Sequence, residues 1–285
     1  MNRLFHIVTL EDISLEQLTD TFNAAFSDYL VKLQLTTDQM LHKIKSENIS
    51  MALSFGAFAG DELVGFILHG SDPYYNPGVL YNAGTGVVPA HRGKQIAGQL
   101  YTHAIEALSR QSFFTHQLEV AVPNLKAMSV YTKLGFHLHR KLVCFRGRPS
   151  APGVAVIPVT QVNVLPWDEL PGFWNHAPTW QNDIPAMQRV SNQLRFYAIL
   201  PGGKPLAYAI VNPLTGRVHQ LAVHPLYRRR GYAGALIMKI AEDITNRDLS
   251  MINIDHSDVA TIAFLKACNL EPFIEQYELK LYTAN

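Results

Sequence analysis

One short motif occurs twice in the chain, and this repeat constrains the fold more than any other feature. The segment VPAHRGKQIAGQL occupies residues 88–100, and HPLYRRRGYAGAL occupies residues 224–236. Arg92 and Arg228 hold the same place in the two copies, and each follows a proline by three positions. A repeat at this period predicts one architecture used twice.

The spacing downstream of the motif repeats as well. The distance along the chain from Arg92 to Asn124 is nearly the same as the distance from Arg228 to Asp258. A chance resemblance would rarely keep both the motif and the distance that follows it. We therefore expect two copies of one larger unit rather than two similar loops.

The length of 285 residues agrees with this expectation, because domains cluster at roughly 100 to 150 residues. Residues 146–153 are rich in Pro, Gly and Arg and lack an apolar pattern, which predicts a linker. The predicted domains are residues 1–148 and 149–285.

Local patterns predict the elements of the first half. Ser14 with Gln17, and Thr36 with Gln39, have the spacing of capping boxes, so two helices should open the chain. Two β-rich runs around Gly60 predict a hairpin. Apolar periodicity then predicts, in order, a strand at 79–88, a helix at 96–109, a strand at 116–122, a helix at 124–134 and a strand near 138–145.

The second half repeats this order. Residues 195–223 contain three strand patterns separated by turns, and the second motif follows them. A helix to about residue 245, a strand at 250–256, a helix at 258–268 and a last strand at 276–282 complete the half. The predicted fold class is therefore α/β (α+β), with a mixed, mostly antiparallel sheet flanked by helices in each half.

The repeated motif has the composition of an anion site. In each copy a strand stops, a basic loop follows, and an amphipathic helix begins at once. The N–H groups of a first helical turn lack internal partners and lie at the positive end of the helix dipole, so they bind anions. Ala97 with Gly98, and Ala233 with Gly234, would let a phosphate approach the backbone closely.

Composition excludes several classes of protein. The 24 basic and 23 acidic residues give a net charge of +1, which argues against a nucleic-acid-binding face. Cys144 and Cys268 have no paired spacing, so we expect free thiols and no metal site. The N-terminus lacks a signal-peptide pattern, and no run approaches the roughly 20 apolar residues of a membrane span. We expect a cytoplasmic protein that does not bind a membrane, as a monomer or a homodimer.

The first motif, followed by LEVAVPNLKAMSVYTKLGF, resembles the GNAT acetyltransferase superfamily. In that family a Val-x-Pro-x-x-Arg-Gly-x-Gly-x-Gly/Ala sequence binds the pyrophosphate of acetyl-CoA. The resemblance covers nearly all of residues 1–146, and a weaker copy covers about 155–283. It implies two tandem GNAT-like folds and an acetyl-CoA-dependent N-acetyltransferase, with acetyl-CoA as co-substrate.

The resemblance assigns cofactor roles in the first half. Backbone groups at the end of the central strand would bind the pantetheine and polarise the thioester carbonyl. The loop and helix start would hold the pyrophosphate, and Asn124 would contact the pantetheine. The implied cofactor residues are Thr85, Gly86, Val87, Arg92, Gly93, Lys94, Gln95, Ile96, Ala97, Gly98 and Asn124.

Two residues of the first half are candidates for catalysis. Tyr131 lies seven residues after Asn124, where the family places the acid that protonates the leaving thiolate. A phenol suits this task because its ordinary pKa, about 10, lies just above that of a thiol. Glu119 stands where some members place the base that deprotonates the amine. Packing of Tyr131 on a helix face and a structural role for Glu119 are the alternatives.

Gln95 departs from the family pattern, which prefers glycine at that position. A side chain there is sterically possible at a helix start with negative φ, and this is what we expect.

The second copy has the better loop and the poorer catalytic helix. Leu265 stands in place of the tyrosine, and leucine cannot give a proton to a thiolate. We therefore expect the first half to be catalytic, and the second to pack against it, to bind CoA without turnover, or to shape the acceptor site. The corresponding cofactor residues are Leu221, Ala222, Val223, Arg228, Arg229, Arg230, Gly231, Tyr232, Ala233 and Gly234.

The acceptor is the least constrained part of the site. In this family the first two helices and the loops over the central strand contribute to it. Phe26, Tyr29, Asp72, Tyr74 and Tyr75 could form an aromatic pocket with a carboxylate for an amine. The partner would be a small-molecule amine or a peptide N-terminus.

Two other functions stay open from the sequence. A non-catalytic acyl-CoA-binding or regulatory module would explain the missing second tyrosine but not Tyr131 together with Asn124 and Glu119. A nucleic-acid-binding protein using Arg228–Arg230 would lose affinity steeply with salt. The even balance of charge counts against that second alternative.

Overall fold

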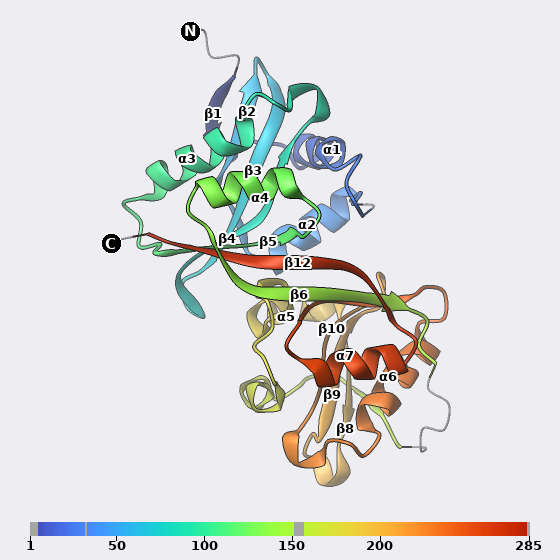
Figure 1. The fold of residues 1–285 in the computed structure, drawn as a ribbon. Helices are drawn as coiled ribbons and strands as arrows, with labels where there is room; N and C mark the ends of the chain where they lie inside the picture. Colours follow the sequence, from blue (N-terminus) through green and yellow to red (C-terminus); the bar gives the residue numbers. More distant parts are fainter. Residues whose placement is uncertain (1–4, 32, 151–156, 284–285) are drawn as a thin grey trace. The chain divides into compact units, whose positions relative to one another are not determined.

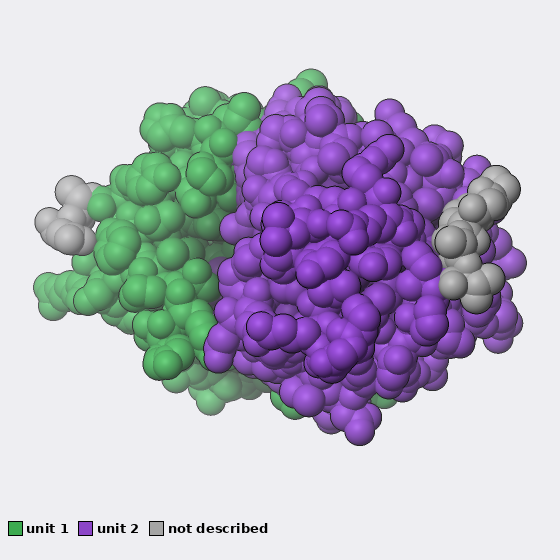
Figure 2. All heavy atoms as spheres, turned by 90° about the horizontal axis from the view of Figure 1, so that it is seen from below, with its two compact units in different colours: residues 1–139, 278–285 green, residues 140–277 purple. Residues whose placement is uncertain are grey.

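The computed structural model describes residues 5–31, 33–150 and 157–283. These residues form two compact units, which are coloured separately in Figure 2. Unit 1 comprises Met1–His139 and Glu278–Asn285, and unit 2 comprises Arg140–Tyr277. The division of the sequence into 1–148 and 149–285 remains our proposal for the two halves of the repeat.

Unit 1 contains the elements of the first half in the predicted order (Figure 1). The N-cap side chains of Ser14 and Thr36 accept hydrogen bonds from the Gln17 and Gln39 backbone N–H groups, so both predicted helix starts are confirmed. The sequence did not predict the short first strand. The elements are β1 (His6–Thr9), α1 (Leu15–Ala25), α2 (Thr37–Ser46), β2 (Ile49–Ala59), β3 (Glu62–Asp72), β4 (Asn76–Val87), the 3-10 turn η1 (Pro89–His91), α3 (Ile96–Leu108), β5 (Thr115–Ala121) and α4 (Leu125–Lys133).

The sheet of unit 1 has the strand order β1-β2-β3-β4-β5, followed by the end of β12 (Glu271–Tyr282). Only β4 and β5 run parallel in that set of five strands. Helices cover both faces. A side chain at Gly65 would meet Ile96 of α3, whereas one at Gly86 would meet Ala25 of α1.

Unit 2 has the same plan with a different start. Residues 163–194 contain short 3-10 turns and one short helix where the first half has α1 and α2. The elements are β7 (Thr160–Val162), η2 (Trp167–Phe173), η3 (Trp180–Asn182), α5 (Ile184–Arg189), η4 (Ser191–Gln193), β8 (Arg195–Ile199), η5 (Pro201–Gly203), β9 (Ala207–Asn212), β10 (Arg217–Val223), η6 (Pro225–Tyr227), α6 (Tyr232–Asp243), β11 (Leu249–Asp255) and α7 (Val259–Ala267).

Alternation along the strands of unit 2 separates two hydrophobic clusters. In β8, Tyr197 packs in the cluster with α6 and α7, whereas its neighbours Phe196 and Ala198 pack in the cluster with η2 and α5. In β9, Ala209 and Tyr208 divide in the same way. This is the expected result of a period of two, and it confirms a mixed sheet with helical cover on both faces.

Two long strands contribute to both units. β6 (His137–Gly147) was predicted to close the first half, but its residues from Arg140 onward belong to unit 2, where they pair antiparallel with β11. Residues of β12 from Glu278 onward belong to unit 1. Gly147 still lies in β6, so the predicted linker at 146–153 starts too early, and its residues 151–153 lie outside the described residues.

Candidate functional site

The two motif arginines are bound by the protein itself, in nearly the same way. In unit 1, Arg92 donates through Nε to the Val87 carbonyl (3.1 Å) and through Nη2 to the Ala25 carbonyl (2.9 Å). In unit 2, Arg228 donates through Nε to the Val223 carbonyl (3.1 Å) and through Nη2 to the Phe173 carbonyl (2.9 Å). Each guanidinium therefore links the end of a strand to the end of an earlier helical segment, α1 in unit 1 and η2 in unit 2.

The third contact of each arginine differs. Arg92 forms a bidentate ion pair with Asp28, at 2.6 and 2.8 Å. The hydrogen bond to Asp28 raises the pKa of Arg92 further, and the pKa of Asp28 is lowered. Arg228 instead donates to the neutral side chain of Asn175, with Nη1 2.6 Å from Oδ1. We call the three contacts of each motif arginine the arginine bracket. Its third partner is a carboxylate in unit 1 and an amide in unit 2.

Both loops place two residues in the left-handed region of backbone space. In unit 1 these are Gly93 (φ 79°) and Gln95 (φ 60°), and in unit 2 they are Arg229 (φ 61°) and Gly231 (φ 84°). The expectation of a negative φ at Gln95 is wrong. A non-glycine residue in this region costs about 1 to 2 kcal/mol, so each loop contains one strained position.

The helices that follow begin without side-chain caps. Gln95 is the N-cap of α3 and Gly231 is the N-cap of α6, and neither makes a side-chain hydrogen bond to the first turn. The first-turn N–H groups therefore have no side-chain acceptor from the cap. This arrangement suits an anion such as a phosphate.

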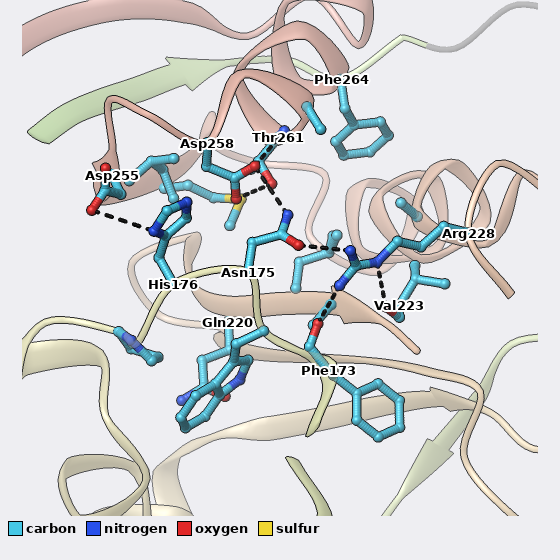
Figure 3. Close-up of a pocket in the computed structure, with 18 of the residues that line it drawn as sticks. Phe173, Asn175, His176, Gln220, Val223, Arg228, Asp255, Asp258, Thr261 and Phe264 are labelled. Atoms are coloured by element: carbon cyan, nitrogen blue, oxygen red, sulfur yellow. Dashed lines mark hydrogen bonds and ion pairs between the residues drawn. The ribbon is translucent and has the colours of Figure 1, made fainter. Parts of the chain in front are cut away.

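A cavity of about 700 Å³ lies in unit 2, between the start of α6, the strands β10 and β11, and α7 (Figure 3). The parallel pairing of β10 and β11 is confined to Arg217 with Ser250, although the strands continue to Val223 and Asp255. The space beyond that pair forms the cavity. The structure brings together in its lining every residue that the second motif suggested: Leu221, Ala222, Val223, Arg228, Arg229, Arg230, Gly231, Tyr232, Ala233 and Gly234.

A chain of hydrogen bonds crosses the wall of this cavity (Figure 3). Asn175 accepts from Arg228 and donates through Nδ2 to Asp258 Oδ1 (3.1 Å). Asp258 is also the N-cap of α7 and accepts from the Thr261 backbone N–H (3.2 Å). The chain fixes the segment around Asn175 against both the loop and α7.

A histidine and a carboxylate lie beyond this chain. His176 Nδ1 is 3.8 Å from Asp255 Oδ2, and both residues line the cavity. Burial raises the pKa of Asp255, but hydrogen bonds from Ser257 outweigh it, with smaller contributions from His176 and Arg140, so the pKa lies below its ordinary value. Asp255 is therefore an anion at neutral pH.

The corresponding strands of unit 1 diverge later. β4 and β5 pair at Val79–Tyr81 with Thr115–Gln117, and then continue to Val87 and Ala121. Near the end of β5, Tyr29 hydrogen-bonds to Asn124 and to the backbone at Ala121. Burial raises the pKa of Tyr29, and these two hydrogen bonds partly offset the rise.

Tyr131 is buried in unit 1, with 8% of its surface exposed. Burial raises the pKa of Tyr131 to about 12, although hydrogen bonds with Thr85 and Asn82 act against the rise. Its ring packs edge-on against Tyr101, with centroids 5.7 Å apart. Tyr131 is thus both a packed aromatic residue and a protonated hydroxyl beside the strand end at Thr85.

The other catalytic candidate, Glu119, lies on β5. It accepts a hydrogen bond from the Tyr81 hydroxyl on β4 (2.6 Å). Asn124, predicted to contact pantetheine, is the N-cap of α4 and accepts from the Ala127 N–H (3.2 Å). Each of these side chains therefore has a structural partner.

The cavity described for unit 1, about 560 Å³, lies elsewhere. It is lined mainly by the outer surfaces of α3 and α4. Gln95 and Gly98 belong to its lining, but Thr85, Val87 and Asn124 do not.

The predicted acceptor pocket does not form as one site. Phe26 packs on Phe66, near the end of the β3–β4 hairpin where Phe66 pairs with Gly86. Asp72 pairs with Asn76 at the opposite end, roughly 20 Å away along the strand. Tyr74 and Tyr75 are exposed there, and the Asp72 carboxylate accepts from the Tyr75 N–H (3.1 Å). Only Phe26 and Tyr29 remain near the strand opening.

Sequence reasoning missed the segment 173–178, which contributes Asn175 and His176 to the unit 2 cavity. It has no helical or strand periodicity, because it joins two 3-10 turns. The repeat offers a weak signal. Because Ala25 and Asp28 contact Arg92 in the first half, a segment before the second motif should contact Arg228 in the same way.

Other kinds of site find no support in the part of the chain that the structure describes. Within it, no group of three or more His, Cys, Asp or Glu side chains could hold a metal ion. Each helix of the described ranges is too short or too polar to cross a lipid bilayer.

Comparisons with known proteins agree with the repeat. The family model for the acetyltransferase (GNAT) family matches residues 13–136 and again residues 159–269. No curated protein sequence matches the chain.

Several solved structures share the fold. A tandem GNAT protein from the clavulanic acid biosynthesis pathway has a TM-score of 0.71 and 15% identity, over 99% of each chain. A GCN5-related N-acetyltransferase from Sphaerobacter thermophilus has a TM-score of 0.73 and 12% identity, over 99% of this chain and 96% of its own. A GNAT-family acetyltransferase from Colwellia psychrerythraea has a TM-score of 0.60 and 16% identity, over 96% and 99%. At these identities the likeness concerns the fold alone.

Proposed function

Because the chain belongs to the acetyltransferase (GNAT) family, we propose that it transfers an acetyl group from acetyl-CoA to a primary amine. The amine attacks the thioester carbonyl directly. One observation carries the proposal, namely the unit 2 cavity, which places a helix start, a strand edge and a basic loop around one space. The acceptor would be a small-molecule amine or a peptide N-terminus.

The residues of unit 2 fit acetyl-CoA. The uncapped first turn of α6, together with Arg229 and Arg230, would hold the pyrophosphate, because anions bind at such helix starts. Beyond Arg217 the edge of β10 diverges from β11, so its backbone groups would bind the pantetheine amides. Arg228 would act through the bracket that holds this loop, since its guanidinium already has three protein partners.

Unit 1 keeps a second proposed site. Its residues Thr85, Gly86, Val87 and Asn124 and the loop Arg92–Gly98 would hold acetyl-CoA, with Tyr131 as the acid. The Tyr131 hydroxyl is protonated and lies beside Thr85, which supports this role, although a pKa of about 12 makes it a weaker acid than an ordinary phenol. Glu119 would be the base for the amine. A pantetheine in this site would compete with Tyr29 for Asn124 and the Ala121 backbone.

A non-catalytic acyl-CoA-binding protein is the second candidate function. Leu265 favours it, because this fully buried leucine replaces the family's tyrosine in the unit whose cavity we propose for CoA. Binding without acetyl transfer to any amine would distinguish this function from the first.

The test is a titration of acetyl-CoA into the wild-type protein and two variants. Ala233→Glu places a carboxylate at the start of α6, and Ala97→Glu is its matched control at the start of α3. The three tryptophans lie in unit 2, and Trp174 lines the cavity, so fluorescence reports binding there and calorimetry reports total binding. We expect Ala233→Glu to weaken binding in unit 2 about 100-fold, because two negative charges would meet there, and Ala97→Glu to leave it within twofold.

Two other outcomes of the titration would change this assignment. An absence of binding to the wild-type protein would contradict the proposal. Loss of binding only in Ala97→Glu would place acetyl-CoA in unit 1.

A further inference from the structure

One side of the unit 2 cavity contains a histidine, His176, and a carboxylate, Asp255, that no sequence motif indicated. We infer that unit 2 is a catalytic site in its own right, in which His176 accepts a proton from the acceptor amine and Asp255 positions the imidazole. This inference rests on the proposed acetyl transfer, and it adds the base and the unit in which the base acts.

His176 is held in place from both sides. Its neighbour Asn175 bonds to Arg228 and to Asp258, and the carbonyl of its other neighbour, Ala177, accepts from Arg140 Nη1 (2.9 Å). The imidazole itself is 37% exposed, so a substrate can reach it. A fixed backbone with an accessible ring is what a general base requires.

Asp255 is fixed as well. Its Oδ1 accepts hydrogen bonds from the Ser257 N–H (2.9 Å) and hydroxyl (2.5 Å), and Arg140 Nη1 lies 3.5 Å from Oδ2. Oδ2 also faces His176 Nδ1 at 3.8 Å, a distance that would shorten in a substrate complex, as catalytic hydrogen bonds often do. With Nδ1 directed at Asp255, Nε2 is left for the amine.

The pair lies at the opposite side of the cavity from the pyrophosphate loop. In Figure 3, His176 and Asp255 lie on the left and Arg228 lies on the right. Asp258 lies between them, bonded to Asn175. A cationic amine would therefore approach the side with Asp255, whose charge Arg140 partly offsets, whereas the anionic cofactor would lie at the side with Arg228, Arg229 and Arg230.

Unit 1 lacks this pair at the corresponding positions. Tyr29 follows Asp28 there as His176 follows Asn175, and Ala121 stands three residues before Asn124 as Asp255 stands three before Asp258. A tyrosine and an alanine cannot form a histidine–carboxylate pair. The pair is thus a property of unit 2 and not of the repeat.

The proposed step balances without a tyrosine. His176 Nε2 takes one proton from the ammonium, and the neutral amine attacks the thioester carbonyl, so that a C–N bond forms and the C–S bond breaks. The second nitrogen proton passes to the departing thiolate, giving free CoA and the amide, and His176 returns its proton to water. A thiol has an ordinary pKa of about 8.5, so the thiolate leaves without a strong acid, which Leu265 could not provide.

The test uses the full chain in the Ala97→Glu background, so that unit 1 is silenced. Thiol release from acetyl-CoA is measured with ethylamine, benzylamine and glycinamide as probes. We expect His176→Gln to lower kcat about 100-fold and to leave acetyl-CoA affinity within twofold. His256→Gln is the matched control, because this exposed histidine follows Asp255 but does not line the cavity, and its kcat should not change.

Two further readouts separate chemistry from structure. Imidazole in the buffer should restore part of the activity of His176→Gly. Asp255→Asn should lower kcat about 10-fold. Added imidazole should not raise the activity of this variant, because the His176 ring is still present in it.

The results that would contradict the role of His176 differ from those that would contradict acetyl transfer itself. A kcat in His176→Gln within twofold of the parent would overturn the role of His176 and leave acetyl transfer intact. An unchanged kcat in Asp255→Asn would overturn the positioning role. Binding of acetyl-CoA without transfer to any of the three amines would overturn N-acetyl transfer and, with it, the base.

Discussion

The loop before α3 and the loop before α6 each hold two residues at positive φ, but glycine stands first in unit 1 and second in unit 2. Gly93 and Gly231 are unstrained, whereas Gln95 and Arg229 occupy the left-handed region at a cost. The arginine brackets differ in a similar way, with Asp28 as partner in one and Asn175 in the other. The same backbone is thus built from different residues, and the difference leaves unit 2 with more positive charge at its cavity.

The largest expected effect is a loss of stability of unit 1 in acid. His69 on β3 and His116 on β5 are buried in unit 1, and burial lowers the pKa of His69 to about 3 and that of His116 to about 4. The unfolded chain binds protons below pH 6.5 while the folded unit does not, so stability is complete above pH 6.5 and falls as the pH falls toward about 3. For His69 the loss is on the order of 4 kcal/mol.

Hydrogen exchange of peptides covering 62–72 and 115–121 measures this loss. Exchange should accelerate between pH 7 and pH 4, after correction for the intrinsic rate. His69→Gln should reduce the pH dependence. Equal protection at both pH values would show that these histidines are accommodated as cations.

Arg228→Ala should destabilise unit 2 by about 3 kcal/mol, because it removes charge-assisted bonds to two carbonyls and leaves the Asn175 side-chain oxygen without its donor. Tryptophan fluorescence during urea unfolding measures the change, since all tryptophans lie in unit 2. Arg92→Ala should cost less, about 1 to 2 kcal/mol, because its ion pair with Asp28 is exposed.

The substitution Asp28→Asn gives unit 1 the neutral partner of unit 2. It should change stability by less than about 1 kcal/mol. A larger cost would mean that the ion pair, and not the carbonyl contacts, holds the bracket of unit 1.

Tyr131→Phe tests whether unit 1 is active. In the Ala233→Glu background, which silences unit 2, the change should lower the remaining acetyl transfer roughly 100-fold and leave acetyl-CoA affinity nearly intact. Steady-state kinetics with the same three amines measures it. If turnover does not change, Tyr131 is a packed aromatic residue and the acid lies elsewhere.

Gln95→Gly should have the smallest effect, a stabilisation of unit 1 by about 1 kcal/mol, because glycine adopts positive φ without a steric cost. Gly231→Ala is the converse change in unit 2 and should destabilise by a similar amount. Thermal unfolding followed by circular dichroism measures both. A stabilising Gly231→Ala would contradict the strain that we assign to this backbone position.

Much of the local structure was predictable. The caps at Ser14 and Thr36, the turn at Gly60 and the helix starts after the two motifs depend on residues within a few positions of one another. Local hydrogen bonds and backbone preferences act over the same short distances. The start of unit 2 was not predicted, because 3-10 turns have no period long enough to detect.

The candidate site was only partly predictable. The residues of the second motif were identified, and they line one cavity, but Arg92 and Arg228 were expected to face a phosphate and instead bind carbonyls of Ala25 and Phe173. Each of those carbonyls belongs to a segment that lies far from its arginine in the sequence. Spacing along the chain cannot reveal such a partner.

The sequence by itself determined the repeat, the order of the elements and the family, because these follow from local patterns and from the spacing of two motifs. Only the tertiary structure decided that the second motif lines a cavity, which strands each unit receives, and that His176 lies 3.8 Å from Asp255. These outcomes depend on which side chains reach across diverging strands. In unit 1 Tyr29 hydrogen-bonds to Asn124 and to the Ala121 backbone beyond the end of β5, and in unit 2 Asn175 and His176 border the cavity.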